Sequence, residues 1–224
     1  MNRRRPGTAG FARFGLLVLL ALGALILVLR ELQPPARPAW PAGTPPMLSD
    51  FHSMRGVGGG RRPQRHQGID FGGPAGQPVI AAADGVVLAA MTERCWGPTV
   101  MIDHGLAADG RTRLVALYGH VEAMLVVPGQ RVTRGQTIAR LGDSYRRFDC
   151  ISGVRHLHFQ LGQRPRTGDR SDYWGHMHFL EDGLSAINPH HHWADGPNRP
   201  TCFDASRTMP AGRLTLPMPC RDPG

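Results

Sequence analysis

The body of this chain is a succession of short apolar runs, each ended by a turn that contains glycine. From residue 67 onward no helical periodicity of apolar residues persists beyond two turns. The composition, with 29 glycines, 20 prolines and only 19% charged residues, favours a turn-rich β protein over a helical bundle. The sequence therefore predicts a mainly β fold of short antiparallel strands.

Turn residues divide this body into expected strands. Residues 78–91 predict a hairpin around Asp84 and Gly85, residues 99–105 and 111–120 are strands that flank a turn at Asp109 and Gly110, and residues 126–142 give two more strands turning at Arg134 and Gly135. A further strand is expected at residues 156–161, in the sequence HLHFQL. After residue 162 the strand pattern weakens into an insertion rich in arginine and glycine, followed by an irregular tail rich in proline.

The first 31 residues have the composition of a membrane or export segment. Residues 14–29 form an uncharged apolar run with four arginines before it and Arg30 after it. As a helix this run covers about 24 Å, and the flanking arginines can extend their charge to the interface, so it predicts one transmembrane helix. The arginines on its N-terminal side place that end in the cytoplasm and the rest of the chain outside. We favour an uncleaved anchor; the alternative is a signal peptide that is cleaved before secretion.

The remaining chain divides into three expected parts. Residues 32–48 form a stiff, proline-rich linker, residues 49–195 the folded domain with an insertion at 162–187, and residues 196–224 a C-terminal extension that contains cysteine. Because export permits disulfides, we expect Cys202 to pair with Cys220, its neighbour in the tail, which leaves Cys95 with Cys150. Free, buried thiols are the alternative.

Arginine supplies all 26 basic residues, and lysine is absent. This excludes chemistry that requires lysine: P-loop nucleotide binding, kinase-type phosphoryl transfer, Schiff-base catalysis, and lipoyl or biotinyl carriers. The net charge of +9 indicates an anionic partner. Nucleic acid is disfavoured, because no aromatic residues interleave with the basic charge and export places the domain away from DNA.

Patterned histidines are the main functional signal. His66 and Asp70 lie four residues apart in RHQGIDF, where a loop enters a strand, and His120 ends a strand in LYGH. His156 and His158 are two residues apart in HLHF, so strand alternation places both imidazoles on one face.

These residue types in this number indicate a catalytic zinc site. Zinc binds neutral imidazole nitrogen and carboxylate oxygen, and a catalytic zinc keeps three protein ligands and a water. His66, Asp70 and one histidine of the HLHF pair supply three ligands. The other histidine of the pair and His120 are then available for proton transfer and for stabilising the transition state. An isolated HxH is more often two hydrogen-bonded histidines, so the prediction depends on the whole constellation.

The order of these motifs resembles the M23 (LytM, lysostaphin-type) zinc endopeptidases. The matching segments are RHQGIDFGGPAGQPVIAAADGVV, TVMIDHG, LVALYGHV, VVPGQRVTRGQTIARLGDS and RHLHFQL, over about residues 50–161. The resemblance implies an antiparallel β-sheet domain with a long groove for substrate, and cleavage of peptide crosslinks in peptidoglycan. By analogy, we expect the target to be a bond between D-alanine and meso-diaminopimelate, with a glycine bridge as the alternative.

Residue roles follow from the resemblance, motif by motif. It implies that His66, Asp70 and His158 bind Zn²⁺ and that His120 and His156 are the catalytic histidines, with the general base unassigned between them. Peptidoglycan stem peptides are the implied substrate, and envelope regulatory proteins are further expected partners. The N-terminal segment adds the expected localisation, which is the cell envelope, with the domain in the periplasm and the anchor in the inner membrane. The alternative function is a non-catalytic envelope regulator that binds and activates other wall hydrolases; the five filled positions argue against it.

The sequence departs from the family pattern after residue 161. A second HxH, His176 and His178, precedes an Asn-Pro pair, and by that spacing alone it would be the ligand pair. We prefer His156 and His158, because HLHFQL closely follows the GDS loop and alternates cleanly. The triplet at residues 190–192 is expected to be exposed in a turn, and His104 to be structural.

Overall fold

The structure is a computed structural model that describes residues 22–24, 37–94, 96–162 and 186–220. Two compact units make up the chain, Met1–Arg37 and Pro38–Gly224. In the first unit only a short helical segment at residues 22–24 and Arg37 are described, so the predicted anchor at residues 1–31 lies almost entirely outside the described residues. Within the described ranges, no helix has the length and apolar character needed to cross a membrane.

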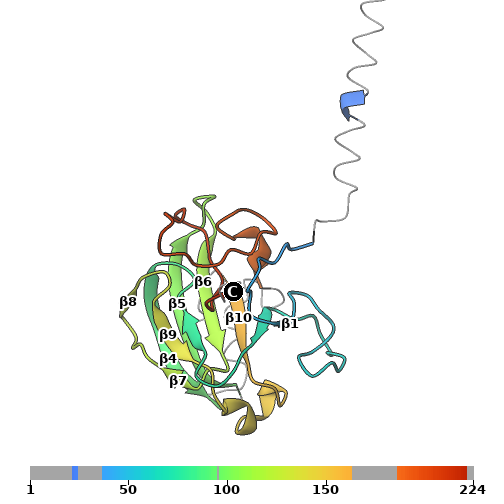
Figure 1. The fold of residues 1–224 in the computed structure, drawn as a ribbon, viewed down its shortest axis with the longest axis vertical. Helices are drawn as coiled ribbons and strands as arrows, with labels where there is room; N and C mark the ends of the chain where they lie inside the picture. The colour runs from blue at the N-terminus through green and yellow to red at the C-terminus, as the bar shows by residue number, and fades with distance from the viewer. Residues whose placement is uncertain (1–21, 25–36, 95, 163–185, 221–224) are drawn as a thin grey trace, which may run out of the picture. The chain divides into compact units, whose positions relative to one another are not determined.

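The second unit is built mainly from β-strands (Figure 1). Its described strands are β1 (Met47–Ser49), β2 (Ile69–Gly72), β3 (Pro78–Ile80), β4 (Gly85–Glu93), β5 (Gly97–Leu106), β6 (Arg113–Gly119), β7 (Ala123–Met124), β8 (Arg131–Val132), β9 (Thr137–Arg140) and β10 (His156–Gly162). Short 3-10 helices are described at η1 (Ser144–Arg146), η2 (Asp149–Ile151) and η4 (Pro189–His191). The mainly β prediction is confirmed.

Two antiparallel sheets contain these strands. The larger has the order β1-β2-β10-β6-β5-β4-β8, and the smaller has the order β3-β9-β7. Figure 1 shows β8 and β1 at opposite edges of the larger sheet, with β10 and β6 between them. The central position of β10 and β6 matters for function, because the histidine motifs lie on or directly after these two strands.

Alternation along β10 separates a core face from a polar face. Leu157, Phe159 and Leu161 are fully buried in the main apolar cluster. Side chains of β2, β9 and the C-terminal segment share this cluster: Ile69, Phe71, Ile138, Trp193, Leu214 and Leu216. Burial of each such side chain contributes about 1.5–3 kcal/mol, which fixes the register of the strand. The intervening residues of β10 must then face the other side of the sheet, as predicted for the two histidines.

The hairpin predicted around Asp84 and Gly85 is wrong. These turn residues direct the chain from one sheet to the other, because β3 pairs with β9, whereas β4 pairs with β5 and β8. The two strands predicted on either side of Arg134 and Gly135 are present as β8 and β9, and they belong to different sheets. Gly135 has φ +79°, and a Cβ there would overlap the ring of Phe203. The turn predicted at Asp109 and Gly110 is confirmed, because β5 and β6 pair around it.

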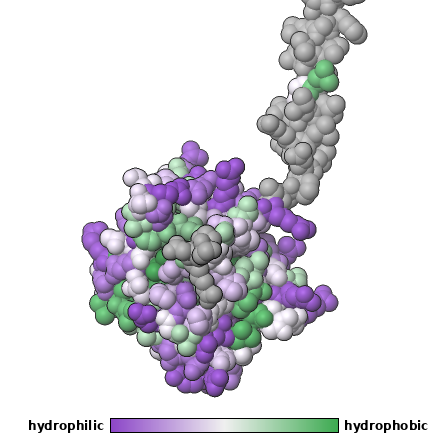
Figure 2. All heavy atoms as spheres, in the orientation of Figure 1, coloured by the Kyte–Doolittle hydropathy of each residue, from purple (hydrophilic) through white to green (hydrophobic). Residues whose placement is uncertain are grey.

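The C-terminal segment is tied to the core by a disulfide and by apolar packing. The predicted Cys202–Cys220 bond is confirmed, with a Cα–Cα distance of 5.8 Å. Cys150 is also disulfide-bonded, while Cys95, its expected partner, lies outside the described residues. Figure 2 shows a mostly hydrophilic face with small apolar patches. Among the described residues of the second unit, the exposed large apolar side chains are spread over several segments: Met47, Met54, Leu106, and the pair Leu125 and Val127.

Candidate active site

Neighbouring strands β2, β10 and β6 bring the predicted site residues together. Asp70 of β2 lies opposite His158 of β10, and His158 lies opposite Gly119, the residue before His120. A cavity of about 190 Å³ opens on this face of the sheet. Its lining consists of Arg62, Pro63, Gln64, Arg65, His66, Gln67, Asp70, Trp96, His120, Cys150, Ser152, His156, His158 and Gln160.

His66 reaches this cavity from the loop before β2. Its backbone is held on both sides, because His52 N–H donates to the His66 carbonyl at 2.8 Å and His66 N–H donates to the Ser53 carbonyl at 3.1 Å. Gly68 then lets the loop run against β10, since a Cβ at this position would lie 2.8 Å from the ring of His158. The spacing of RHQGID therefore depends on the absence of a side chain at Gly68.

Three buried side chains form a compact cluster at the base of the cavity. His66 Nε2 lies 3.1 Å from His158 Nδ1, and Asp70 Oδ1 lies 2.8 Å from His158 Nδ1 and 3.1 Å from His66 Nε2. In the part of the chain that the structure describes, this is the one group of three histidine, cysteine or acidic side chains with the spacing to hold a metal ion.

In each of His66 and His158, one ring nitrogen faces the cluster (the inner nitrogen) and the other points away from it (the outer nitrogen). Both outer nitrogens lie next to hydrogen-bond acceptors. His66 Nδ1 lies 3.0 Å from the main-chain oxygen of Asp50, and His158 Nε2 lies 3.0 Å from Gln160 Oε1. A carbonyl oxygen can only accept, so each outer nitrogen carries the proton and the inner nitrogen of the neutral ring carries a lone pair. Two inner nitrogens and a carboxylate oxygen at such distances require a positive charge between them. Two neutral imidazoles and one carboxylate, oriented by outer hydrogen bonds, fit a zinc ion.

Asp70 supplies the negative charge of the cluster. Burial alone would raise the pKa of Asp70, but hydrogen bonds with His158 and His66 hold it well below its usual range. Its second oxygen, Oδ2, accepts from Arg62 Nη2 at 2.8 Å. Burial lowers the pKa of His66, although its hydrogen bond with Asp70 opposes this effect. An ionised carboxylate and a neutral imidazole are the protonation states that a divalent cation needs.

His120 and His156 lie beside the cluster with a different arrangement of hydrogen bonds. His120 Nδ1 lies 2.8 Å from the Trp96 carbonyl, and His156 Nδ1 lies 2.7 Å from the Val154 carbonyl. Both rings line the cavity, with centroids 4.9 Å apart, and His156 Nε2 lies 3.7 Å from Asp70 Oδ1. Burial is the largest cause that lowers the pKa of both histidines. Each is therefore a neutral imidazole whose Nε2 can accept a proton.

Other histidines have structural surroundings or differ from expectation. His104 matches the structural expectation, with Nδ1 held by the Asp84 carbonyl and Nε2 by the Tyr118 hydroxyl, both at 2.9 Å. The exposed turn predicted for residues 190–192 is wrong at His190, which is only 4% exposed because its ring nitrogens are bonded inside the protein. The second pair, at residues 176 and 178, lies outside the described residues.

Sequence reasoning missed the residues that hold the site from outside. Asp50, Arg62 and Gln160 each contact a member of the cluster. Gln160 had a usable signal, because it continues the two-residue period of His156 and His158 and so must share their face. Asp50 and Arg62 lie before the HxxxD motif, in segments with no pattern that points to the site.

Comparisons with known proteins agree with the motif order. Residues 64–172 match the sequence profile of peptidase family M23. The chain is 36% identical over 106 residues to peptidoglycan DD-endopeptidase ShyA of Vibrio cholerae, with 47% of this chain and 22% of that protein covered. It is 38% identical over 103 residues to murein hydrolase activator NlpD of Escherichia coli, with 46% and 24% covered.

Each match covers only part of the similar protein. A zinc-containing peptidase from Vibrio cholerae of known structure is 28% identical, with a TM-score of 0.43, and the match covers 59% of this chain and 39% of that one. This chain spans less than a quarter of the length of ShyA and of NlpD, so the similarity concerns one domain of each. Over residues 64–172 this chain therefore matches peptidase family M23, as the motif order predicts.

Proposed function

We propose that this protein is a zinc-dependent endopeptidase that hydrolyses peptide crosslinks of peptidoglycan in the cell envelope. The observation that carries the proposal is the convergence of His66 Nε2, Asp70 Oδ1 and His158 Nδ1 within 3.1 Å at the base of an open cavity. Similarity to a peptidoglycan DD-endopeptidase supports the substrate class. The proposed bond is the D-alanyl to meso-diaminopimelyl crosslink.

In this proposal His66, Asp70 and His158 hold Zn²⁺. Bound there, zinc supplies Lewis-acid activation of a water molecule and of the scissile carbonyl. The protein contributes orientation, since the Asp50 carbonyl and Gln160 Oε1 fix which nitrogen of each ligand ring faces the ion. Asp70 contributes charge and is steadied by Arg62 through its second oxygen.

His120 and His156 carry out the proton transfers. One imidazole takes a proton from the attacking water at Nε2. The other first takes a proton from solvent at its own Nε2 as negative charge develops on the oxygen of the scissile carbonyl, and it then donates a hydrogen bond to that oxygen. The first then returns its proton to the leaving amine. Both Nδ1 atoms remain bonded to main-chain carbonyls throughout, which keeps each ring oriented.

The site of action follows from the N-terminal composition. The apolar run at residues 14–29, with arginines on its N-terminal side, supports an inner-membrane anchor and a domain in the periplasm. Secretion after cleavage of the same segment is the alternative. The net charge of +9 supports attraction to the carboxylates of peptidoglycan stem peptides.

The test is cleavage of purified sacculi by the full-length chain, either loaded with zinc or treated with chelator. Mass analysis of the released muropeptides should show that crosslinked dimers fall to monomers only with zinc. His158→Ala should be inert because it removes a proposed ligand, whereas His178→Ala is the matched control and should be active. The reverse result would transfer the ligand role to the second HxH pair.

Activation of other wall hydrolases is the second candidate function. It is favoured by the similarity to the murein hydrolase activator NlpD. Intact dimers after incubation with the zinc-loaded chain, together with faster digestion when a wall hydrolase is added, would support activation and reject the endopeptidase proposal.

A further inference from the structure

A chain of hydrogen bonds, buried at Trp193 and partly buried at Asp50, joins the C-terminal part of the molecule to His66. Trp193 Nε1 donates to His190 Nδ1 at 3.0 Å, and His190 Nε2 lies 2.7 Å from Asp50 Oδ1. The main-chain oxygen of Asp50 in turn accepts from His66 Nδ1 at 3.0 Å. Residues far apart in sequence therefore lie together next to His66. Residues 190 and 193 lie beyond the family match, which ends at residue 172.

The proton positions in this chain are determined by the chemistry of its ends. An indole N–H is only a donor, so His190 Nδ1 must accept from Trp193 and Nε2 must carry the proton. That proton is donated to the carboxylate of Asp50. Trp193 is fully buried in the core, and Trp40 packs edge-on against the His190 ring at 5.6 Å. The imidazole of His190 is thus fixed in both position and tautomer.

Asp50 transmits this position to the cluster. It directly follows β1, and its neighbour Ser49 pairs with Asp70 across the β1–β2 ladder. Its carboxylate oxygen Oδ1 is held between His190 and the Phe51 N–H, the latter at 2.7 Å. The position of the Asp50 main chain is therefore held by the β1–β2 ladder before it and by the hydrogen bonds of its own side chain. The Asp50 carbonyl is the acceptor that directs His66 Nε2 toward Asp70.

We propose that His190 is a positioning residue of the metal site. By holding Asp50, it keeps the Asp50 carbonyl in place to accept the His66 Nδ1 proton, so that the lone pair of Nε2 faces the ion before the ion binds. This inference rests on the zinc site of the proposed function. It adds the segment that contains residues 190 and 193 to that site.

The test measures zinc affinity of the full-length chain by competition with a chromophoric chelator. His190→Leu should weaken zinc binding about tenfold, the lower end of the range for outer partners of metal ligands. His190→Gln should restore most of the affinity, because its amide oxygen can accept from Trp193 and its amide nitrogen can donate to Asp50. His191→Ala is the matched control; this neighbour is exposed, and its affinity should equal that of the wild type.

Asp50→Ala provides a second route that spares the core. It removes the carboxylate that His190 holds but keeps the main-chain carbonyl, and it should weaken zinc binding in the same direction as His190→Leu. The ¹⁵N shifts of His66 in metal-free protein should also lose the signature of a single Nδ1–H tautomer in both variants. Wild-type affinity in both variants would overturn this inference alone, whereas failure of the wild type to bind zinc would overturn the metal site itself.

Discussion

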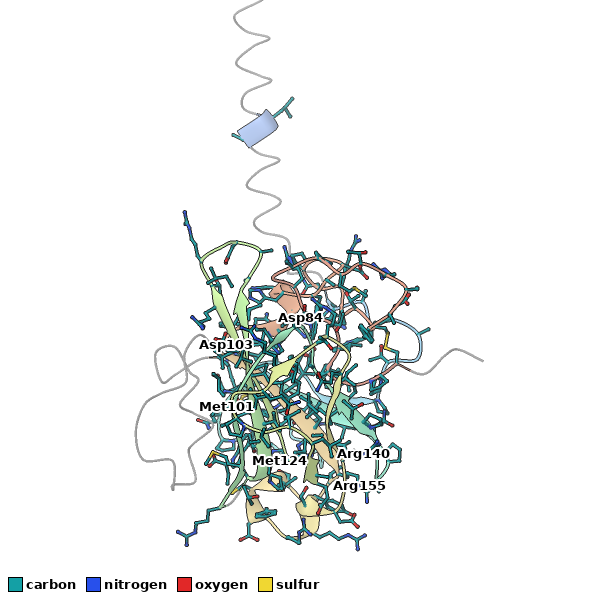
Figure 3. All side chains as sticks on the ribbon, turned by 90° about the vertical axis from the view of Figure 1, so that its left-hand side faces the viewer. Asp84, Met101, Asp103, Met124, Arg140 and Arg155 are labelled. Carbon is teal, nitrogen blue, oxygen red and sulfur yellow. A yellow bond between two sulfur atoms is a disulfide. The ribbon has the colours of Figure 1, made fainter. Side chains whose placement is uncertain are left out.

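His104 lies toward one end of the larger sheet and the cavity histidines His120 and His156 lie toward the other, and they differ in one respect. Asp84, whose carbonyl holds His104, lies at the upper end in Figure 3, and Arg155, which precedes His156, lies at the lower end. His104 has a neutral partner for each ring nitrogen. At the lower end, His120 and His156 have a carbonyl partner for Nδ1 and leave Nε2 facing the cavity.

This difference is what distinguishes the histidines proposed to be catalytic from the structural His104. Burial lowers the pKa of His104 to about 4, and burial also lowers the pKa of His120 and His156. A depressed pKa therefore does not separate the two groups. The second nitrogen separates them, because a lone pair that faces a cavity can take a proton or bind a metal and one that is already bonded cannot.

The largest effect should come from removing a lone pair that faces the cavity. His120→Ala and His156→Ala should each lower the turnover of crosslinked muropeptides by roughly 10²–10⁴-fold, the usual contribution of a general acid or base. Zinc affinity should change only a few-fold, since neither residue belongs to the three-residue cluster. His104→Leu is the control and should retain turnover. Equal loss of turnover in His104→Leu would break the comparison.

An intermediate effect should follow from changing an outer acceptor. Gln160→Leu removes the oxygen that holds His158 Nε2–H and should weaken zinc binding by about 10–100-fold. Gln160→Glu keeps an acceptor of similar size and should bind zinc at least as tightly as the wild type. Chelator competition measures both. The reading of the His158 tautomer fails if the Leu variant binds zinc normally.

The smallest effect should come from the satisfied histidine. His104→Leu removes the hydrogen bonds from His104 to the Tyr118 hydroxyl and the Asp84 carbonyl, and it should lower the free energy of unfolding by about 1–3 kcal/mol. Urea titration in chelator measures the loss. Zinc affinity should be unchanged, and a weaker zinc site in this variant would mean that the two ends of the sheet are coupled.

The pH dependence of the free energy of unfolding gives a second test of the His104→Leu prediction. The pKa of His104 in the folded protein is about 4, below its ordinary value of 6.5, so the unfolded chain binds more protons between these values. The stability contributed by neutral His104 is therefore complete above pH 6.5 and is lost as the pH falls toward 4, with a slope of at most about 1.4 kcal/mol per pH unit. His104→Leu should lack this part of the slope.

Local patterns in the sequence predicted the parts of the fold and site that depend on single strands. Alternation in HLHFQL correctly placed Leu157 in the core, with His156 and His158 on the opposite face. The turn at Asp109 and Gly110 was also predictable, because it joins strands that pair directly. In both cases the determining interactions lie within a few residues along the chain.

Contacts between distant segments were not predictable in this way. The sequence of a glycine turn is the same whether the next strand pairs with the preceding one or enters another sheet. Asp84 and Gly85 therefore suggested a hairpin that does not form. His190 appeared exposed in a polar triplet, and only the approach of Asp50 and Trp193 in the folded chain accounts for its burial. Strand pairing and the burial of His190 depend on contacts between distant segments, which local sequence patterns do not reveal.

His120 also carries a consequence for how such a chain evolves. It has φ +65°, a left-handed conformation that costs a side-chain-bearing residue about 1–2 kcal/mol relative to glycine. Selection for stability alone would therefore favour glycine or asparagine at this position. Under the catalytic role proposed for His120, its retention in a lineage would record selection for chemistry against the preference of the backbone, and its loss would mark descendants that keep the fold without the proposed activity.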